Sequence, residues 1–568
     1  MGLSALSEVV SLGALLPFIG ILTSPDRVLN HPRFADVFSA WGITTPGQLV
    51  LPFAVLFASA AVTAAALRLL LLWSTSRLAN GMSTDFGIEI YRRALYQPYS
   101  VHVARNSSSV LSGITHKVDD ATMMLMGLLT LVTDVVLLLA VISALMAVHP
   151  VVATLSAVGF GGSYALTSWT ARRRLRHNGV LIAREHTSII KVVQEGLGGI
   201  RDVLLDWTQP AYIEMYRKAN ASLRSAVAEN ELIKGAPRSV MEAVGIVLVV
   251  GLVCWLSSAS GGLSAALPVL GVLALGAQRL LPVLQRAYDS WSFIVVTIVP
   301  VSDVLDMLDQ PLPAEASLPA PMPLELQHGV GFESVKFRYT KDGPWVIDGL
   351  NLSIPKGIRM GVVGATGSGK STLLDLLTGL LPPTEGSILV DGVPVTSERL
   401  RAWQRSVAHV PQSIYLSDST IAENIAFGTA PHAIDMERVR QTAAQAQIAD
   451  FVESRPDGYA SMIGERGIRL SGGQRQRVGI ARALYKKGSV LVFDEATSAL
   501  DNTTEQSVMD TIEGLDRELT IIIIAHRVTT VRRCDRLVEL IGGRAVEYQS
   551  YEQMVERSPS ARQTFIAI

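Results

Sequence analysis

The sequence predicts a multi-domain protein, with an all-α transmembrane domain of six helices followed by an α/β domain. Its 568 residues are too many for one compact core. The composition is 49% hydrophobic and only 17% charged, with a mean hydropathy of +0.34, which indicates that lipid covers much of the apolar surface. Long apolar runs fill the first half of the chain, whereas short β-like runs alternate with helical patterns in the second half.

Six apolar runs approach the length of about 20 residues that a helix needs to cross a bilayer. They cover residues 4–22, 49–73, 123–148, 151–170, 240–258 and 263–284. We interpret the first run as a span, because we find no signal-peptide cleavage site after it. The transmembrane domain is therefore predicted to cover residues 1–310. A proline-dense linker follows at residues 311–324, and the α/β domain covers residues 325–568.

Two long connections, residues 77–120 and 171–238, are rich in lysine and arginine. Basic loops stay in the cytoplasm, so both connections and both chain ends are predicted to be cytoplasmic. The second connection has a helical pattern, broken near Gly196–Gly199 and near Pro210, which predicts two long stalks joined by a short helix. A disordered basic loop is the alternative, but Ile, Leu and Val recur too regularly for disorder.

A glycine-rich segment lies between a predicted strand at residues 360–363 and a predicted helix. Glycines let backbone N–H groups surround a phosphate at a helix N-terminus, Lys370 can neutralise the phosphates, and Ser371 can bind Mg²⁺. This context favours a phosphate-binding P-loop over a glycine-rich turn that matches by chance. The predicted nucleotide-binding residues here are Gly364, Ala365, Thr366, Gly367, Ser368, Gly369, Lys370, Ser371 and Thr372.

Two further segments suit nucleotide chemistry. The apolar strand at residues 490–493 ends in Asp494, which would lie near the metal ion, and Glu495, which would polarise an attacking water. A second anion-binding helix start is predicted at Ser471, Gly472, Gly473 and Gln474, where exposed amides meet the positive end of a helix. One chain thus carries two phosphate-binding segments.

Together these motifs make residues 325–568 resemble the nucleotide-binding cassette of ABC transporters, whose signature segment is similar to Leu470–Gln474. The resemblance implies that Tyr339 stacks on adenine and that Gln412 lies in the Q-loop, at the site of Mg²⁺ and the attacking water. The alternative is a strand-edge tyrosine with no ligand, which the position of Tyr339 about 25 residues before the P-loop disfavours.

Two more residues take roles from this resemblance. Asp501 resembles the D-loop aspartate that contributes to the nucleotide site, and His526 resembles the switch histidine that contacts the γ-phosphate. A lone histidine after a strand is usually structural, but its place in the full ordered set of motifs favours the catalytic role.

In this family, the P-loop of one cassette and the signature of another enclose ATP together. Since the chain supplies one cassette, the resemblance implies a homodimer that hydrolyses ATP with Mg²⁺ at two sites. The domain order and long stalks resemble six-span exporters of a bacterial-type plasma membrane, with the cassette in the cytoplasm. We expect the bend at residues 197–207 to dock onto the cassette near Gln412.

Two other function classes were weighed. A membrane protein that uses the cassette for gating or sensing without transport is disfavoured by the intact Glu495 and His526. A soluble cassette ATPase that acts on nucleic acid is excluded by the six spans, so no nucleic-acid partner is expected.

The N-terminal half more loosely resembles bacterial flippases of lipid-linked oligosaccharides. The similar segments are Leu16–Ile19, Phe34–Phe38 and Arg279–Pro282 with Arg286. This resemblance implies that membrane lipids are partners and that the substrate is a polyisoprenyl-pyrophosphate-linked glycan or another anionic amphipathic lipid. Flipping of lipid A or phospholipid, and export of peptides or drugs, stay as alternatives.

Four arginines lie within the predicted spans or at their ends, and they are the candidate substrate residues: Arg68, Arg238, Arg279 and Arg286. An arginine inside a bilayer is costly, so it usually faces a partner or an aqueous cavity. These arginines could hold an anionic head group, because guanidinium groups bind phosphate oxygens in pairs. Alternatively they pair with carboxylates, for which the candidates are Glu8, Asp134, Glu242 and Asp289.

Overall fold

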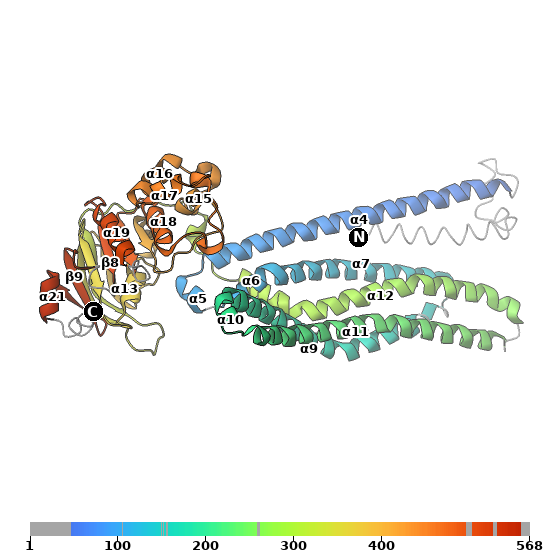
Figure 1. The fold of residues 1–568 in the computed structure, drawn as a ribbon. Coiled ribbons are helices and arrows are strands. Elements are labelled where there is room, and N and C mark those ends of the chain that lie inside the picture. The colour runs from blue at the N-terminus through green and yellow to red at the C-terminus, as the bar shows by residue number, and fades with distance from the viewer. Residues whose placement is uncertain are drawn as a thin grey trace. The chain divides into compact units, whose positions relative to one another are not determined.

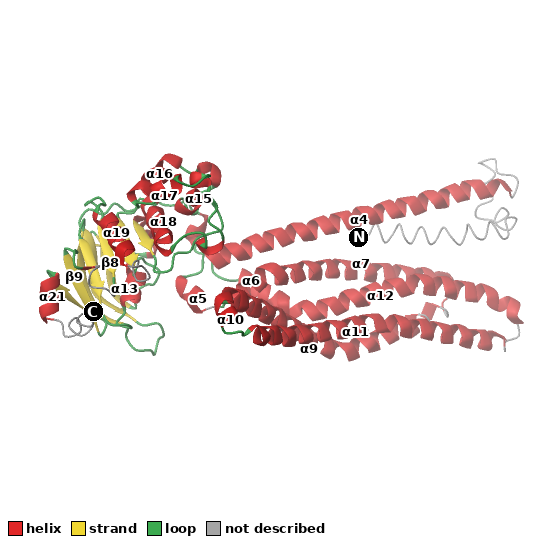
Figure 2. Ribbon diagram, in the orientation of Figure 1, coloured by secondary structure: helices red, strands yellow, loops and turns green. Residues whose placement is uncertain are grey.

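The structure is a computed structural model that describes residues 47–104, 106–148, 150, 153–154, 157–257, 262–495, 502–525 and 531–557. The chain divides into two compact units. The first unit contains the chain up to Gln97 and Val101–Ala316, and the second contains Pro98–Ser100 and the chain from Ser317 onward. In the described residues, every strand belongs to the second unit (Figure 2).

Long helices build the first unit. Those described are α4 (Gly47–Leu95), α7 (Val118–Val148), α9 (Gly162–Gly198), α11 (Gln209–Ser257) and α12 (Gly262–Leu308). Shorter elements are α6 (Ser107–Ser112), α10 (Ile200–Leu205) and two π-helical turns, η1 (Gly113–Lys117) and η2 (Ala157–Gly161). In Figure 1, α7, α9, α11 and α12 run alongside one another as a packed bundle.

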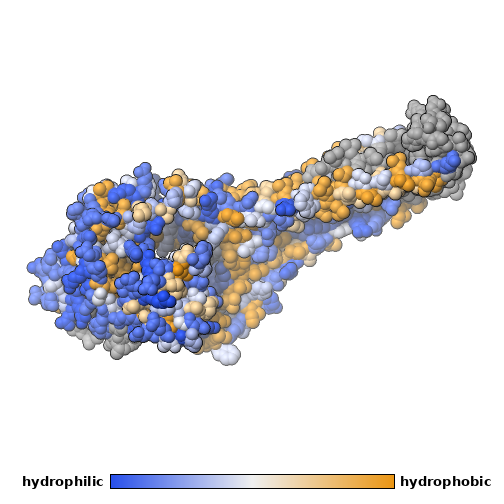
Figure 3. Space-filling view, turned by 90° about the horizontal axis from the view of Figure 1, so that it is seen from above, coloured by the Kyte–Doolittle hydropathy of each residue, from blue (hydrophilic) through white to orange (hydrophobic). Residues whose placement is uncertain are grey.

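The described residues of the five later predicted spans are helical. Three described stretches are long and apolar enough to cross a membrane, namely Val50–Leu95, Ser107–Ser143 and Leu280–Leu308. Large apolar side chains are exposed along the helices, as Figure 3 shows, and Leu69 on α4 is 67% exposed. Such exposure is expected where lipid is the solvent. The first predicted span, residues 4–22, lies outside the described residues.

The basic connection at residues 171–238 is helical, so the alternative of a disordered loop is wrong. Helix α9 continues to Gly198, the short helix α10 follows, and α11 begins at Gln209. The predicted break near Pro210 is confirmed, because residues 206–208 separate α10 from α11. Pro210 lies directly after this break. It is the second residue of α11, where a backbone N–H would have no partner within the helix, so proline is tolerated there.

Helices α9 and α12 approach each other closely at Gly179. A Cβ atom at this position would lie 2.2 Å from the carbonyl oxygen of Val296. Leu175 and Val295 are buried beside it. Small residues of this kind allow helix backbones to pack tightly in membranes, where packing rather than the hydrophobic effect holds helices together.

A polar contact joins α9 to α11. The side-chain amide of Asn178 donates hydrogen bonds to Asn230 Oδ1 (2.9 Å) and to Glu229 Oε2 (3.0 Å). Both asparagines are buried, so each polar group needs such a partner.

The second unit contains two sheets. A four-stranded antiparallel sheet has the order β2-β1-β4-β5, and a six-stranded sheet has the order β10-β9-β3-β8-β7-β6, parallel except for β10. The strands are β1 (Gly329–Phe337), β2 (Ile347–Pro355), β3 (Arg359–Val363), β4 (Glu385–Val390), β5 (Val393–Pro394), β6 (Val407–Val410), β7 (Val490–Asp494), β8 (Thr520–Ile524), β9 (Arg536–Ile541) and β10 (Arg544–Tyr548).

Helices cover both faces of the six-stranded sheet. They are α13 (Lys370–Leu377), α14 (Ser397–Ser406), α15 (Ile421–Ile425), α16 (Met436–Gln445), α17 (Ala449–Glu453), α18 (Gly472–Tyr485), α19 (Asn502–Glu513) and α21 (Tyr551–Arg557). Alternate residues of β7 enter opposite cores: Val490 and Val492 pack in the core that contains α13, whereas Leu491 and Phe493 pack in the core that contains α18. Burial on both faces explains why the strand is apolar throughout.

We expect Gly179→Ala to lower the stability of the first unit by about 1–3 kcal/mol, because its methyl group would displace the α12 backbone at Val296. The melting temperature of the purified protein in detergent measures this effect. Gly235→Ala is the matched control on α11, since no heavy atom lies within 4 Å of its added Cβ. Equal melting temperatures for both variants would contradict the close packing of α9 on α12.

Candidate functional site

The loop between β3 and α13 requires glycine at two positions. Gly367 has φ +81° and Gly369 has φ +103°, which are left-handed conformations that residues with a side chain rarely adopt. At Gly369, a Cβ atom would also lie 3.1 Å from the carbonyl oxygen of Val346. The loop leads directly into α13, whose first backbone N–H groups have no partner within the helix and can bind phosphate.

Lys370 places a buried positive charge at this helix start. Its side chain is only 6% exposed, and Nζ donates to the carbonyl oxygens of Gly364 (2.8 Å) and Ala365 (3.2 Å). Burial lowers the pKa of Lys370, whereas the nearby carboxylates of Glu495 and Asp494 raise it. Lys370 and both carboxylates are therefore close enough to interact, as the sequence motifs predict.

The strand order explains how these segments meet. Strands β3, β8, β7 and β6 are parallel neighbours, so the chain leaves all four at the same edge of the sheet. The P-loop follows β3, Glu495 follows β7, and Gln412 lies two residues after β6. The side-chain amide of Gln412 donates a hydrogen bond of 2.8 Å to Glu495 Oε2.

Glu495 has an unusual backbone conformation. Its φ of +47° lies in the left-handed region, which costs a residue with a side chain roughly 1–2 kcal/mol. The backbone N–H donates to the carbonyl oxygen of Ile524 on β8 (2.9 Å), and this bond holds the residue in place. Backbone strain of this kind clusters at functional sites, where neighbouring structure over-determines the conformation.

Tyr339 lies beside the start of α13. Its hydroxyl is 3.0 Å from Thr372 Oγ1, and its ring packs edge-on against Phe337 with 5.0 Å between the ring centroids. The side chain is 61% exposed, so the ring could receive a flat aromatic ligand. This position fits the predicted adenine-stacking residue.

Ser471 and Gln474 cap the start of α18. The Gln474 backbone N–H donates to Ser471 Oγ (3.3 Å), and the Ser471 N–H donates to Gln474 Oε1 (2.9 Å). This capping box fixes the helix start that carries Gly472 and Gly473. Among the described residues, these four form no hydrogen bond with the P-loop.

Sequence reasoning missed Arg482, which ties α18 to the segment after Gln412. Its guanidinium donates to the carbonyl oxygens of Tyr415 (2.7 Å) and Asn424 (2.8 Å), and burial lowers its pKa to about 10. Nearby, a Cβ atom on Gly479 would lie 2.4 Å from Ile414 Cδ1. The Q-loop segment and the signature helix are therefore packed together. An isolated arginine in a basic helix gives no sequence signal of this role.

The predicted metal ligands are Ser371, Gln412 and Asp494. Their hydroxyl, amide and carboxylate oxygens are the hard donors that Mg²⁺ prefers, so the donor set fits this ion. Asp501 and His526 lie outside the described residues.

Two of the candidate substrate arginines form separate ion pairs with carboxylates rather than one shared cluster. Arg286 binds Asp134 with an N–O distance of 3.1 Å, and Arg238 binds Glu242 at 3.2 Å. These are two of the carboxylates that the alternative interpretation names. Arg68 lies on α4 and Arg279 on α12, but the side chain of Arg279 is outside the described part.

Both units resemble known protein families. Residues 12–264 match the ABC transporter transmembrane region, and residues 347–498 match the ABC transporter family. The chain is 31% identical to an ATP-dependent lipid A-core flippase of Cupriavidus metallidurans, over 85% of this chain and 81% of that protein. It is 28% identical to the heterocyst differentiation ATP-binding protein HepA of a Nostoc species, over 98% and 90% respectively.

A solved structure extends this likeness to the whole fold. The structure of a bacterial Atm1-family ABC exporter with ATP bound matches 99% of this chain and 98% of its own, with a TM-score of 0.79 and 25% identity. Such exporters couple ATP hydrolysis to transport, and their transmembrane helices make them multi-pass membrane proteins. The chain belongs to the ABC transporter family, as an exporter half-transporter that joins a transmembrane region to one ATP-hydrolysing cassette.

Proposed function

We propose that this exporter works as a homodimer that moves an anionic amphipathic lipid across a bacterial-type plasma membrane, with the cassette and both chain ends in the cytoplasm. The hydrogen bond between Gln412 and Glu495, beside the buried Lys370, carries the catalytic part of this proposal. The basic connections between the spans support the orientation.

In the proposed reaction, Glu495 orients the attacking water, and Gln412 holds the Glu495 carboxylate in position. Lys370 and the P-loop amides bind the β- and γ-phosphates, Tyr339 stacks on adenine, and His526 contacts the γ-phosphate. Bound by Ser371, Gln412 and Asp494, Mg²⁺ would neutralise charge on the phosphates.

The signature segment supports the homodimer. Its Ser471 and Gln474 bond to each other and, among the described residues, form no hydrogen bond with the P-loop of the same chain. The backbone amides at this helix start thus remain suited to the nucleotide of a second cassette. Asp501 would contribute to the same composite site. Two identical chains would then enclose two ATP molecules.

The lipid substrate is supported by the lipid A-core flippase relative, which is named for a lipid that it flips. Within this class we propose a polyisoprenyl-pyrophosphate-linked glycan, with Arg68, Arg238, Arg279 and Arg286 as candidate residues for its phosphates, because guanidinium groups bind phosphate oxygens in pairs. Lipid A offers phosphate groups too, so it is the second candidate.

Mass spectrometry of lipids extracted from the purified protein, followed by flipping assays in proteoliposomes, distinguishes these two candidate lipids. Retention and ATP-dependent flipping of neither lipid would refute the proposal.

We expect Glu495→Gln to keep ATP binding but to lower ATP turnover by about 100-fold or more, because the amide preserves size but cannot act as a base. Turnover in proteoliposomes and ATP affinity by filter binding measure the two effects. The exposed control Glu437→Gln should hydrolyse ATP normally. Near-normal turnover of Glu495→Gln would refute the role given to this residue.

Lys370→Ala should instead weaken ATP binding itself, by about tenfold or more, because it removes a charge-assisted contact to the phosphates. Titration with a fluorescent ATP analogue measures this affinity. The nearby exposed Lys341→Ala is a control for the loss of one positive charge. Equal affinities for the two variants would show that Lys370 does not contact the nucleotide.

Arg286→Gln would remove the ion pair between Arg286 and the buried Asp134 carboxylate, so the change is best made together with Asp134→Asn. If Arg286 holds an anionic head group, this double variant should fold but move several-fold fewer lipids per ATP hydrolysed. Proteoliposomes that report both lipid flipping and phosphate release measure this ratio. A ratio equal to that of the exposed control Arg217→Gln would mean that the Arg286 pair is only structural.

A further inference from the structure

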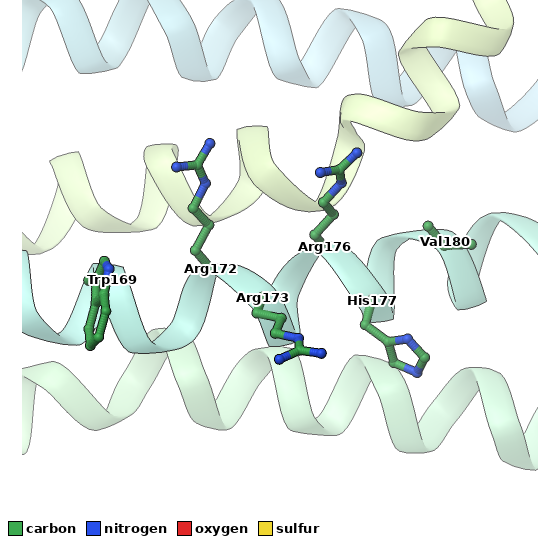
Figure 4. A pocket seen from close by; sticks show the side chains of 6 residues that line it. All are labelled: Trp169, Arg172, Arg173, Arg176, His177 and Val180. Atoms are coloured by element: carbon green, nitrogen blue, oxygen red, sulfur yellow. The ribbon is translucent and has the colours of Figure 1, made fainter.

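A groove between α9 and α12 carries arginines that the proposed ATP cycle does not use. The groove encloses about 640 Å³, and its lining includes Trp169, Arg172, Arg176, Trp291, Ile294 and Ile298. A neighbouring hollow of about 480 Å³ shares the first three of these residues. Figure 4 shows this hollow, in which Arg172 and Arg176 extend to the same side of α9 and Arg173 extends to another side.

Arg172 and Arg176 are exposed and lie four residues apart, which places them on one face of the helix. Neither forms an ion pair with a carboxylate in the described part of the chain, and no aspartate or glutamate lines the groove. Arg174, between them in sequence, does have a partner, Glu229. Two neighbouring guanidinium groups without an acidic partner suit a phosphate group, whose oxygens can accept bonds from both.

The other walls of the groove are apolar. Val295 and the side chains of Ile294 and Ile298 form the α12 side, and Trp291 lies beside them. On α9, the arginines directly follow the apolar run at residues 151–170, and Trp169 at its end is 77% exposed. Tryptophan is enriched at membrane interfaces, so the exposed Trp169 supports a position of the arginines near the lipid head groups. A lipid could therefore place its phosphate at the arginines and an acyl chain along α12. Free phosphate would contact only the arginines of the groove and not its apolar residues.

We propose that this groove binds an anionic glycerophospholipid from the surrounding leaflet, with the phosphate held between Arg172 and Arg176. Arg238 and Arg286 already pair with carboxylates and do not line this groove. The site is therefore separate from these two candidate substrate arginines, and its lipid is a resident ligand whose binding does not require transport.

Native mass spectrometry of the full-length protein tests this proposal, with phosphatidylglycerol as the probe and phosphatidylcholine as the zwitterionic comparison. Arg172→Gln/Arg176→Gln should lower phosphatidylglycerol affinity by about tenfold or more, because two charge-assisted contacts are lost. Binding of phosphatidylcholine should change little. The control Arg217→Gln/Lys218→Gln removes the same charge from exposed positions of α11 and should keep wild-type affinity.

A second variant distinguishes loss of lipid binding from misfolding of the protein. Arg172→Lys/Arg176→Lys keeps both charges but loses the paired geometry of the guanidinium, so we expect an intermediate affinity. The proposal is overturned if the glutamine or lysine variant binds phosphatidylglycerol as the wild type does. It is also overturned if the α11 control loses as much affinity, or if inorganic phosphate displaces the lipid at equimolar concentration. None of these readouts involves ATP turnover or flipping, so they remain informative if the proposed transport function fails.

Discussion

The buried charge of Lys370 is the interaction on which the nucleotide end of the second unit depends. Lys370 is only 6% exposed, so its buried charge needs polar or negatively charged partners. The carbonyl oxygens of Gly364 and Ala365 accept its hydrogen bonds, and two carboxylates lie nearby. This arrangement requires the loop before α13 to fold back on itself, which the left-handed glycines permit. It also requires β7 to end close to β3, although these strands lie far apart in sequence. The parallel order of the sheet meets that requirement.

The arginines of the first unit differ in whether a carboxylate pairs with them. Where arginine lies among the packed helices, a carboxylate accompanies it, as Asp134 accompanies Arg286. Pairing of this kind lowers the cost of burial, although it also reduces the charge available to a ligand. At the end of the apolar part of α9, Arg172 and Arg176 have no such partner in the described chain, and water or lipid head groups must solvate them. Arginines without an acidic partner in the described chain therefore lie directly after an apolar run of α9.

Much of both units could be predicted from sequence because local patterns specify them. The predicted strands at residues 360–363 and 490–493 are confirmed within a few residues, since short apolar runs in the sequence determine them. Strands β9 and β10 were not predicted, because charged residues such as Arg536 and Glu547 interrupt their apolar pattern. The helical stalks and the break near Pro210 are confirmed, and Pro210 itself lies in the first turn of α11, where proline removes no helical hydrogen bond.

By itself, the sequence determined the order of the transmembrane region and the cassette, and it predicted the spans and the motif residues of the ATP site, because spacing and residue type within one short segment carry that information. Only the tertiary structure decided which distant residues meet. The bond from Gln412 to Glu495, the anchoring of the Q-loop segment by Arg482 and the choice of Asp134 as the partner of Arg286 all join separate segments. Sequence periodicity reports which face of an element is apolar but not which element covers it. That choice depends on close packing, as at Gly179, where the absence of one side chain lets α9 reach the α12 backbone.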